Sequence, residues 1–477
     1  MQHVVKSIPV GTTLLTPMPS LISMRRLASL ISERVNRIPH GQRLTRGAFW
    51  CVVGSLVPKL MSVPASVVLA RLMTPMHYGE LAIIQSSVDL FGIFAGFGLS
   101  MTATKYVAEL RGKDQQRTGR ILALSTVTAC ITGTVVAVLL FMLSPWLAAR
   151  TLAAPHLAGA LRIGAFQLFF ASLSGAQCGA LFGFEAFRTT ARLQTMIGVL
   201  NVPLMVGGFL VYGLKGVLWG MVLGRFAEWL LRQLAVRAEA RRAGVQIQYR
   251  ACTQELGLLW QFSLPALISG VLVLPVNWAC AAMLVNQPNG YTEMGIYNAA
   301  SQWYNALLFL PVSIGTVLLP VLSDRMGNGD ARESSAVLGY MLRFNAAIVL
   351  PWVILISLAS PYIMRIYGRE YSHAWVTLVL VVLTAGIFVV LMPVGDVIAA
   401  SGHMWLGCAM NAGWALVLVP LTSLLVHRGF GSLGLASARL FAYSIHAIWT
   451  FLFACHVLRK AKHPIGIANL QTTVAEL

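Results

Sequence analysis

Four charged residues interrupt long apolar runs of this sequence, namely Lys59, Asp89, Arg225 and Arg439. A charge at the centre of a bilayer costs roughly 2.5–3.5 kcal/mol even on the lenient insertion scale, so such residues usually face a cavity or a partner. Arginine binds phosphate through paired hydrogen bonds, and two guanidinium groups around a central cleft would suit a diphosphate. We therefore take these four residues as candidate substrate-binding residues.

A structural role is the alternative for Arg225. Glu228 follows it by three residues in the segment GMVLGRFAEW, and residues with this spacing can pair on one helix face. Arg439 has no carboxylate close to it in sequence, and Tyr443 lies on its helix face instead. Counted from the predicted span ends, both arginines lie near mid-depth at matching levels. The sequence therefore favours a cavity-lining role somewhat more for Arg439 than for Arg225.

Lys59 and Asp89 fall at mid-depth on consecutive spans that run in opposite directions. One interpretation is an ion pair between them, and the other is a pair of cavity charges that bind a substrate or titrate during transport. Pro58 and Pro64 flank Lys59 and are expected to kink its helix, because each removes a backbone donor. The kink would be either a moving gate or a static bend.

The elements that carry these charges are predicted transmembrane helices. Of the 477 residues, 57% are hydrophobic and 11% are charged, with a mean hydropathy of +0.73. Apolar stretches long enough to cross about 30 Å of hydrocarbon recur along the chain, and no alternating pattern of barrel strands appears. The sequence predicts an all-α polytopic membrane protein with about twelve spans. They cover residues 48–69, 79–104, 120–143, 158–183, 195–213, 216–236, 258–284, 293–322, 338–359, 373–399, 404–426 and 432–458.

An internal repeat with an offset of about 216 residues indicates a duplication. Features that match at this offset, slipping slightly near the end, are Gly79 with Gly295, Gly98 with Gly315, Asp114 with Asp330, Ser144-Pro145 with Ser360-Pro361, and Gly220 and Arg225 with Gly434 and Arg439. Two six-helix lobes related by a pseudo-two-fold axis along the membrane normal are expected. The predicted parts are a basic, poorly ordered tail (1–45), an N-lobe (46–237), a cytoplasmic linker (238–257), a C-lobe (258–459) and a second tail (460–477).

The net charge of +19 is read as a topology signal. With the N-terminus in the cytoplasm, most Lys and Arg residues fall on the cytoplasmic side, in the tails and in the segments 105–120, 185–194, 232–250 and 325–343. This is the positive-inside rule, and it predicts a multi-pass protein of the bacterial inner membrane with both termini cytoplasmic. Membrane lipids are therefore the expected surroundings, and nucleic acid is not an expected partner.

Sequence motifs for catalysis are absent. The chain has no GxxxxGK[ST], HExxH or GxSxG pattern, so no nucleotide loop or hydrolase site is predicted. Its seven cysteines are scattered singly, without a CxxC pair, which argues against a zinc site or a disulfide framework. We expect no catalytic residues, no cofactor and no metal, and movement of a substrate is the default function.

Two segments resemble the polysaccharide transporter family of the MATE-like MOP superfamily, namely FSLPALISGVLVLPVNW (262–278) and IYNAASQWYNALLFLPVSIGTVLLPVLSD (296–324). Two shorter segments are similar to that family as well, YGELAIIQSS (78–87) and GLSMTATKYVAEL (98–110). The resemblance implies a flippase of the type that serves O-antigen and exopolysaccharide synthesis. Such a protein moves undecaprenyl-diphosphate-linked oligosaccharide across the inner membrane by alternating access. It further implies a cationic cleft. A coupling ion and a polysaccharide polymerase are the further partners that the resemblance allows.

Two other functions stay open at this level. A MATE-type drug or cation antiporter would share the fold, but a cationic substrate favours acidic cavity residues. The charged residues predicted at mid-membrane depth lean slightly basic, three against two: Lys59, Arg225 and Arg439 against Asp89 and Glu228. A membrane polysaccharide polymerase or ligase would need a sizeable outer loop with catalytic residues, and the outer loops predicted at 144–157 and 360–372 are short.

Overall fold

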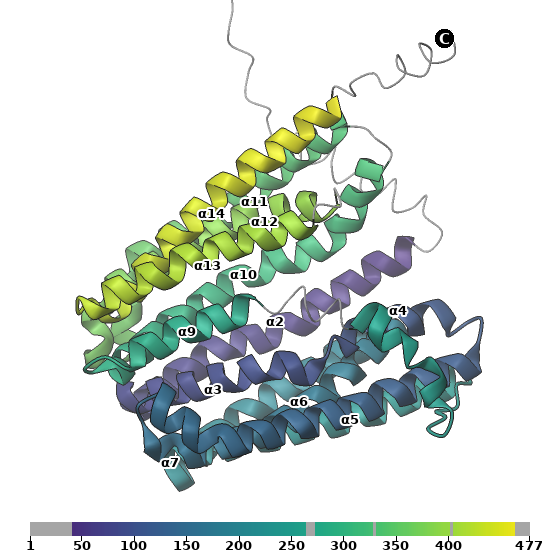
Figure 1. Ribbon diagram of the computed structural model, residues 1–477, viewed down its shortest axis with the longest axis horizontal. Coiled ribbons are helices and arrows are strands. Elements are labelled where there is room, and N and C mark those ends of the chain that lie inside the picture. Colours follow the sequence, from purple (N-terminus) through teal and green to yellow (C-terminus); the bar gives the residue numbers. More distant parts are fainter. Residues whose placement is uncertain (1–40, 264–271, 328–330, 401–403, 463–477) are drawn as a thin grey trace, which may run out of the picture. The chain divides into compact units, whose positions relative to one another are not determined.

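The computed structural model describes residues 41–263, 272–327, 331–400 and 404–462. The chain divides into two compact units, Met1–Phe49 and Trp50–Leu477, and all contacts below lie within the second. Most of the two predicted tails, 1–45 and 460–477, lies outside the described residues. In chain order the elements are α2 (Gly41–Leu72), α3 (Pro75–Gly96), α4 (Leu99–Leu110), α5 (Gln115–Trp146), η1 (Leu147–Thr151), η2 (Pro155–Leu157), α6 (Ala158–Gly183), α7 (Phe187–Arg242), η3 (Cys252–Glu255), η4 (Leu259–Ser263), α9 (Val273–Val285), α10 (Gly290–Gly327), α11 (Ala331–Tyr367), η5 (Arg369–Ala374), α12 (Trp375–Ala400), α13 (Met404–His427) and α14 (Gly431–Lys462) (Figure 1).

The described residues form helices and no strands. Seven of these helices are long and apolar enough to cross a membrane, and the bent pair α3 and α4 makes an eighth if it counts as one span. Helical segments also lie over each of the predicted spans. The prediction of an all-α, multi-pass membrane protein is confirmed.

Two predicted spans are less regular than expected. The span 79–104 bends by 40° between α3 and α4, where Phe97 has φ 45° and Gly98 has φ 64°. Glycine adopts this left-handed conformation at little cost, so Gly98 is a natural position for the bend. The span 258–284 contains the π-helical turn η4 and the shorter helix α9.

Helix α7 contains two of the predicted spans, 195–213 and 216–236, and reverses direction between them. The break lies at Tyr212 and Gly213, whose φ/ψ values of −134°/20° and 57°/−137° are not helical. The two arms then pack closely, since a Cβ at Gly208 would lie 2.2 Å from the backbone oxygen of Gly216. The second arm continues to Arg242, beyond the predicted start of the linker at 238.

Helices from the two halves of the sequence meet most closely where α3 crosses α10. A Cβ added to Gly79 would lie 1.8 Å from the oxygen of Tyr291, and one added to Gly295 would lie 2.0 Å from the oxygen of Pro75. Gly79 and Gly295 are the first matched pair of the repeat, and here they contact each other. Small residues let helix backbones approach closely in membranes, so this crossing depends on both glycines.

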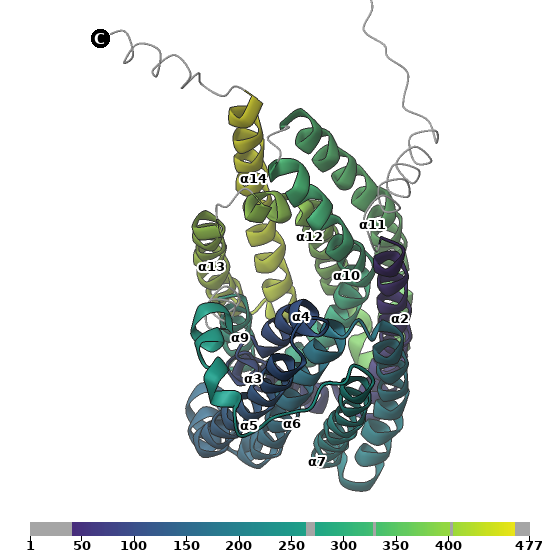
Figure 2. The same cartoon turned by 90° about the vertical axis from the view of Figure 1, so that its right-hand side faces the viewer.

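On the other side of α10, helix α14 packs between α12 and α13 and also reaches α10 (Figure 2). Its N-terminus is held by Glu293 of α10, whose Oε2 accepts a hydrogen bond of 2.7 Å from the backbone N–H of Ser432. A carboxylate at this end of a helix is favourable because the unpaired N–H groups carry partial positive charge. This contact fixes the start of α14 against α10.

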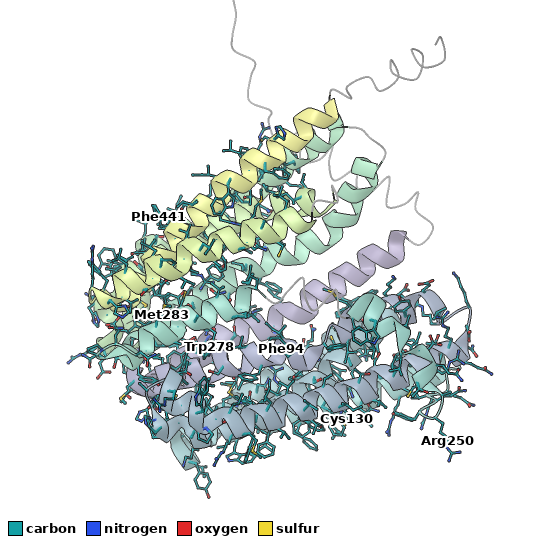
Figure 3. The ribbon with its side chains drawn as sticks, viewed as in Figure 1. Phe94, Cys130, Arg250, Trp278, Met283 and Phe441 are labelled. Carbon is teal, nitrogen blue, oxygen red and sulfur yellow. The ribbon has the colours of Figure 1, made fainter. Side chains whose placement is uncertain are left out.

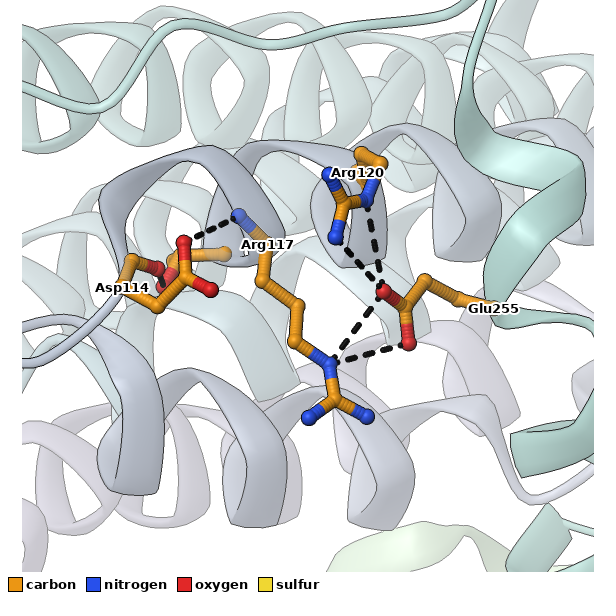
Figure 4. A network of polar contacts seen from close by, with 5 residues as sticks. Asp114, Arg117, Arg120 and Glu255 are labelled. Atoms are coloured by element: carbon orange, nitrogen blue, oxygen red, sulfur yellow. Dashed lines mark hydrogen bonds and ion pairs between the residues drawn. The ribbon is translucent and has the colours of Figure 1, made fainter.

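The segment that connects the two halves is bound to the start of α5 (Figure 4). Asp114 caps α5 by accepting a bond of 2.8 Å from the N–H of Arg117. Arg117 and Arg120 then hold the buried carboxylate of Glu255 in η3, at 3.1 Å and 3.2 Å. Because Glu255 is enclosed and paired with two cations, the connector is fixed to the first half rather than lying free.

Substitution of Gly79 by alanine is expected to destabilise the protein. The new methyl group would overlap the backbone of α10 and force the helices apart, at a cost of about 1–3 kcal/mol. A lower apparent Tm in detergent, read by fluorescence-detected size exclusion, is the expected result. Gly96→Ala is the matched control because nothing lies within 4 Å of its Cβ position. An equal effect of the two substitutions would contradict the role of the crossing.

Candidate functional site

A cavity of about 530 Å³ lies among helices from both halves of the sequence. Its walls come from α2, α3 and α7 on one side and from α9, α10, α13 and α14 on the other. Most of its polar lining is neutral, made of serine, asparagine, glutamine and tyrosine side chains. Asp89 and Arg439 are the charged residues in that lining. The cavity is thus wet enough for a polar ligand and carries one charge of each sign.

Arg439 of α14 is held by tyrosines. Its Nη1 donates a hydrogen bond of 2.7 Å to the hydroxyl oxygen of Tyr297, and its guanidinium lies 4.9 Å from the ring centre of Tyr304 and 5.8 Å from that of Tyr443. Its Nε is buried without a hydrogen-bond partner. Among the described residues no carboxylate pairs with it, so this guanidinium keeps its charge available to a ligand.

Asp89 faces the same cavity from α3. Its Oδ1 accepts a hydrogen bond of 3.1 Å from Nε2 of Gln85, one helical turn earlier. Lys59 lines a different space, and within the described part of the chain it forms no ion pair with Asp89. The structure therefore gives no support to the interpretation of Lys59 and Asp89 as a structural pair.

A second, smaller cavity of about 270 Å³ contains Lys59 and Arg225. Glu228 binds two arginines there, Arg225 at 2.9 Å and Arg232 at 2.8 Å. Arg232 also donates a bond of 3.1 Å to the backbone oxygen of Ser174. Three cations against one carboxylate leave this cavity positively charged.

The placement of Arg225 and Arg439 around one cleft stays a prediction: Arg439 lines the large cavity and Arg225 the adjoining smaller one. The two cavities adjoin at Pro58, Gly198 and Asn201, which line both. A Cβ at Gly198 would lie 2.9 Å from the ring of Pro58, so α2 and α7 are in close contact at this point. The pairing of Arg225 with Glu228 that their spacing allowed is confirmed.

Sequence reasoning placed Tyr443 on the helix face of Arg439, which the contact between them confirms, but it missed Arg232, Tyr297 and Tyr304 as neighbours of the candidate residues. Arg232 was counted with the cytoplasmic basic segment 232–250, although its spacing of four residues from Glu228 is the signal that could have found it. Tyr297 and Tyr304 lie on one face of α10, seven residues apart, but their contact with Arg439 joins helices that are distant in sequence. Only the packing of α14 on α10 brings them together.

The two halves are joined firmly at the helix ends that the topology prediction places outside. Ser66 of α2 and Tyr367 of α11 share a hydrogen bond of 3.1 Å, and Nε of Arg71 donates one of 2.6 Å to the oxygen of Ile366. A further contact between the halves is made by Trp278 on α9, labelled in Figure 3, whose indole N–H donates a bond of 2.9 Å to Oγ of Ser87 on α3. These contacts close one end of the space between the halves.

Comparison with known proteins identifies the family. Residues 68–376 match the profile of a family described as polysaccharide biosynthesis protein. The chain belongs to that family. It is 24% identical over 388 residues to the EPS I polysaccharide export inner membrane protein EpsE of Ralstonia solanacearum, covering 80% of this chain and 86% of that protein. It is 27% identical over 323 residues to the lipid III flippase of Escherichia coli strain K12, covering 64% of this chain and 73% of that protein.

Solved structures show the same fold. The lipid II flippase MurJ in an inward closed conformation matches with a TM-score of 0.66 at 13% identity, over 86% of this chain and 89% of that one. An inward-facing multidrug resistance MATE family transporter of the MOP superfamily matches with a TM-score of 0.63 at 15% identity, over 89% of this chain and 96% of that one. Relatives of this chain are named as a polysaccharide export protein, a succinoglycan biosynthesis transport protein and a lipid III flippase. This family member is accordingly a membrane transporter and not an enzyme.

Loss of the Glu228 carboxylate is expected to destabilise this family member. Glu228→Gln would leave Arg225 and Arg232 side by side without their common partner, at a cost of about 2–4 kcal/mol. The pair of Glu239 and the exposed Arg242 on the same helix, at 2.9 Å, supplies the control. Glu239→Gln should change stability by less than about 1 kcal/mol. Thermal unfolding in detergent measures both, and equal shifts would argue against the buried network.

Proposed function

We propose that this protein is a flippase for undecaprenyl-diphosphate-linked oligosaccharide, working by alternating access in the bacterial inner membrane for surface polysaccharide synthesis. The observation that carries the proposal is the guanidinium of Arg439, which lines the large cavity without a carboxylate partner among the described residues. The family and its relatives supply the context, since one relative is named a lipid III flippase and another a polysaccharide export inner membrane protein.

The physical need for such a protein is clear. A sugar diphosphate cannot leave water for hydrocarbon without losing its hydrogen bonds and its ionic hydration. A cavity lined by neutral polar groups replaces the hydrogen bonds that the sugar made to water. A guanidinium replaces the ionic hydration of the diphosphate, because it offers paired donors to the phosphate oxygens. Arg439 is suited to this task because its Nε has no partner in the protein.

A MATE-type antiporter of drugs or cations is the second candidate, favoured only by the fold likeness to MATE transporters. The positive charge of Arg439 in the cavity argues against an antiporter of cations. A cationic drug in this space would meet Arg439, whose charge is offset by tyrosine hydroxyl and ring faces alone in the described part. Asp89 is the one carboxylate in the lining, and its partner Gln85 leaves its second oxygen open to hydroxyl donors as much as to a cation.

The architecture in this proposal is twelve transmembrane helices in two six-helix lobes, residues 46–237 and 258–459, related by a pseudo-two-fold axis along the membrane normal. The contact between the matched residues Gly79 and Gly295 supports it, because equivalent positions meet one another only near a two-fold axis. With both termini in the cytoplasm, the bond between Ser66 and Tyr367 would close the periplasmic end. The cavity would then be open towards the cytoplasm.

The four candidate residues take different roles in this scheme. Arg439 would bind the diphosphate, and Asp89 would face the attached sugar in the same cavity. Lys59 and Arg225 would make the smaller cavity attractive to anions beside the path of the lipid head group. A coupling ion would supply the driving force, and a polysaccharide polymerase would receive the unit on the periplasmic side.

Removal of the Arg439 charge is expected to slow transport. Arg439→Gln should lower translocation of labelled undecaprenyl-diphosphate oligosaccharide in vesicles by at least about tenfold, the value of one or two charge-assisted hydrogen bonds. Arg439→Lys should keep part of the activity, since it keeps the charge and loses the planar fork.

Arg162→Gln is the control for this experiment. Arg162 is an exposed cation on α6, 5.1 Å from the ring of Phe141, and lines neither cavity. At equal protein abundance it should transport like the parent protein. Full activity of Arg439→Gln, or export of a cationic dye in the same vesicles, would overturn the proposal.

The proposed orientation predicts which residues are accessible from outside the cell. In a background without the native cysteines, Arg150→Cys on η1 should react with a membrane-impermeant thiol reagent in intact cells. Arg241→Cys at the end of α7 should react only after the membrane is permeabilised. Both side chains are exposed, so burial does not distinguish them, and the reverse pattern would place the termini outside.

A further inference from the structure

The large cavity has two polar walls made by the same positions of two helices. On α10, the side chains of Asn298, Ser301, Gln302 and Asn305 line the cavity at spacings of three, four and seven residues. Residues with these spacings share one face of a helix. This face is about 10 Å long at 1.5 Å per residue, which is comparable to a disaccharide.

The opposite wall, on α3, repeats this face at the offset of the duplication. Gln85, Ser86 and Asp89 line the cavity from α3. Matched pairs in the cavity lining are Tyr78 with Met294, Leu81 with Tyr297, Ala82 with Asn298, Gln85 with Ser301, Ser86 with Gln302, and Asp89 with Asn305. Since α3 and α10 cross at Gly79 and Gly295, corresponding residues lie at similar distances from the crossing, and the two polar faces meet across the same space.

Several atoms on these faces have no partner in the protein. Oε1 of Gln85 and Oγ of Ser301 are buried without a hydrogen bond, and buried polar groups are nearly always satisfied in a complete structure. Polar side chains often join transmembrane helices to each other. Here Gln302 instead bonds Asn298 on its own helix, at a long 3.4 Å. Asn305 is exposed and has no hydrogen bond within the described part of the chain.

We propose that the matched faces of α3 and α10 form a two-sided site for the glycan, with Gln85, Ser86 and Asp89 on one side and Asn298, Gln302 and Asn305 on the other. This inference rests on the proposed function and names the class of its cargo, a neutral sugar rich in hydroxyl groups. Amide groups both donate and accept hydrogen bonds, as sugar hydroxyls do. Tyr297, which bonds Arg439, is next to Asn298 on α10, so a diphosphate on Arg439 places its first sugar at the start of these faces.

The charges of the two faces set the selectivity. Asp89 is the one carboxylate among the matched positions, and its counterpart Asn305 is a neutral group of the same size. A carboxylate accepts hydrogen bonds from hydroxyl groups but repels the like charge of an acidic sugar placed beside it. The site therefore rejects a uronic acid at this position while it binds a neutral hexose. Its selectivity comes both from charge repulsion of the wrong sugar and from hydrogen bonds to the right one.

Equilibrium binding to the purified full chain in detergent tests this inference with three labelled probes. They are undecaprenyl diphosphate, the same lipid with a neutral disaccharide, and the same lipid with a disaccharide that contains a uronic acid. Gln302→Leu combined with Asn305→Leu should weaken binding of the neutral glycan lipid about tenfold, the value of two hydrogen bonds. Binding of undecaprenyl diphosphate should stay within about twofold in the same variant, since Arg439 is intact.

Two further variants complete the test. Asp89→Asn should raise binding of the uronic acid lipid about fivefold relative to the neutral glycan lipid, because the repulsion is removed. Gln287→Leu, an amide in the turn after α9 that lines neither cavity, should change nothing. If the double variant does not fold, Gln302→Leu alone decides instead, since the loss of one amide should weaken binding of the neutral glycan lipid about fivefold and leave undecaprenyl diphosphate within about twofold.

The outcomes separate the two proposals. A parent protein that binds neither undecaprenyl diphosphate nor the neutral glycan lipid overturns the proposed function and this inference with it. A parent protein that binds undecaprenyl diphosphate and the glycan lipid equally well, or a double variant that loses both lipids equally, overturns the glycan site alone. Unchanged binding of the uronic acid lipid by Asp89→Asn overturns the selectivity against acidic sugars.

Discussion

The close crossing of α3 and α10 is the contact on which the rest of the arrangement depends. Backbone atoms of two helices touch at Gly79 and Gly295, with no side chain between them. This contact brings the two halves of the sequence together at one end of the cavity. Beyond it the helices carry polar residues in the same register, so the cavity is lined from both sides by matched positions. Any larger residue at the crossing would change the separation of both walls at once.

The arginines within the membrane-spanning helices have two different kinds of partner. Arg225 and Arg232 share the carboxylate of Glu228, and that network is largely satisfied within one half. Arg439 has hydroxyl and aromatic neighbours instead, and a desolvated cation over aromatic rings gains about 2 kcal/mol or more. These neighbours offset part of the cost of burial and leave the charge unneutralised. The first arrangement stabilises the fold, and the second is the one that we propose as an anion site.

Much of this architecture was accessible from the sequence, but the location of the site was less so. Hydrophobic runs predicted the helices, and the spacing of Arg225 and Glu228 predicted their pair, because both signals are local. The offset that matches Gly79 with Gly295 indicated a duplication, yet nothing in the sequence said that these two residues touch. Tyr297 and Tyr304 reach Arg439 from α10, and Pro58 and Gly198 bring α2 and α7 together where the two cavities adjoin, so these contacts join helices distant in sequence. Side-chain spacing within one helix cannot report such contacts.

The tyrosines around Arg439 have a consequence for the half of the cycle in which nothing is carried. A flippase that has delivered its lipid must return empty, and a lone guanidinium left without water or counter-ion would oppose that return. The hydroxyl of Tyr297 and the rings of Tyr304 and Tyr443 lie against the charge of Arg439. In the proposed transport cycle these three side chains would stay with the arginine during the return step, so that turnover would not require a second anion to accompany it.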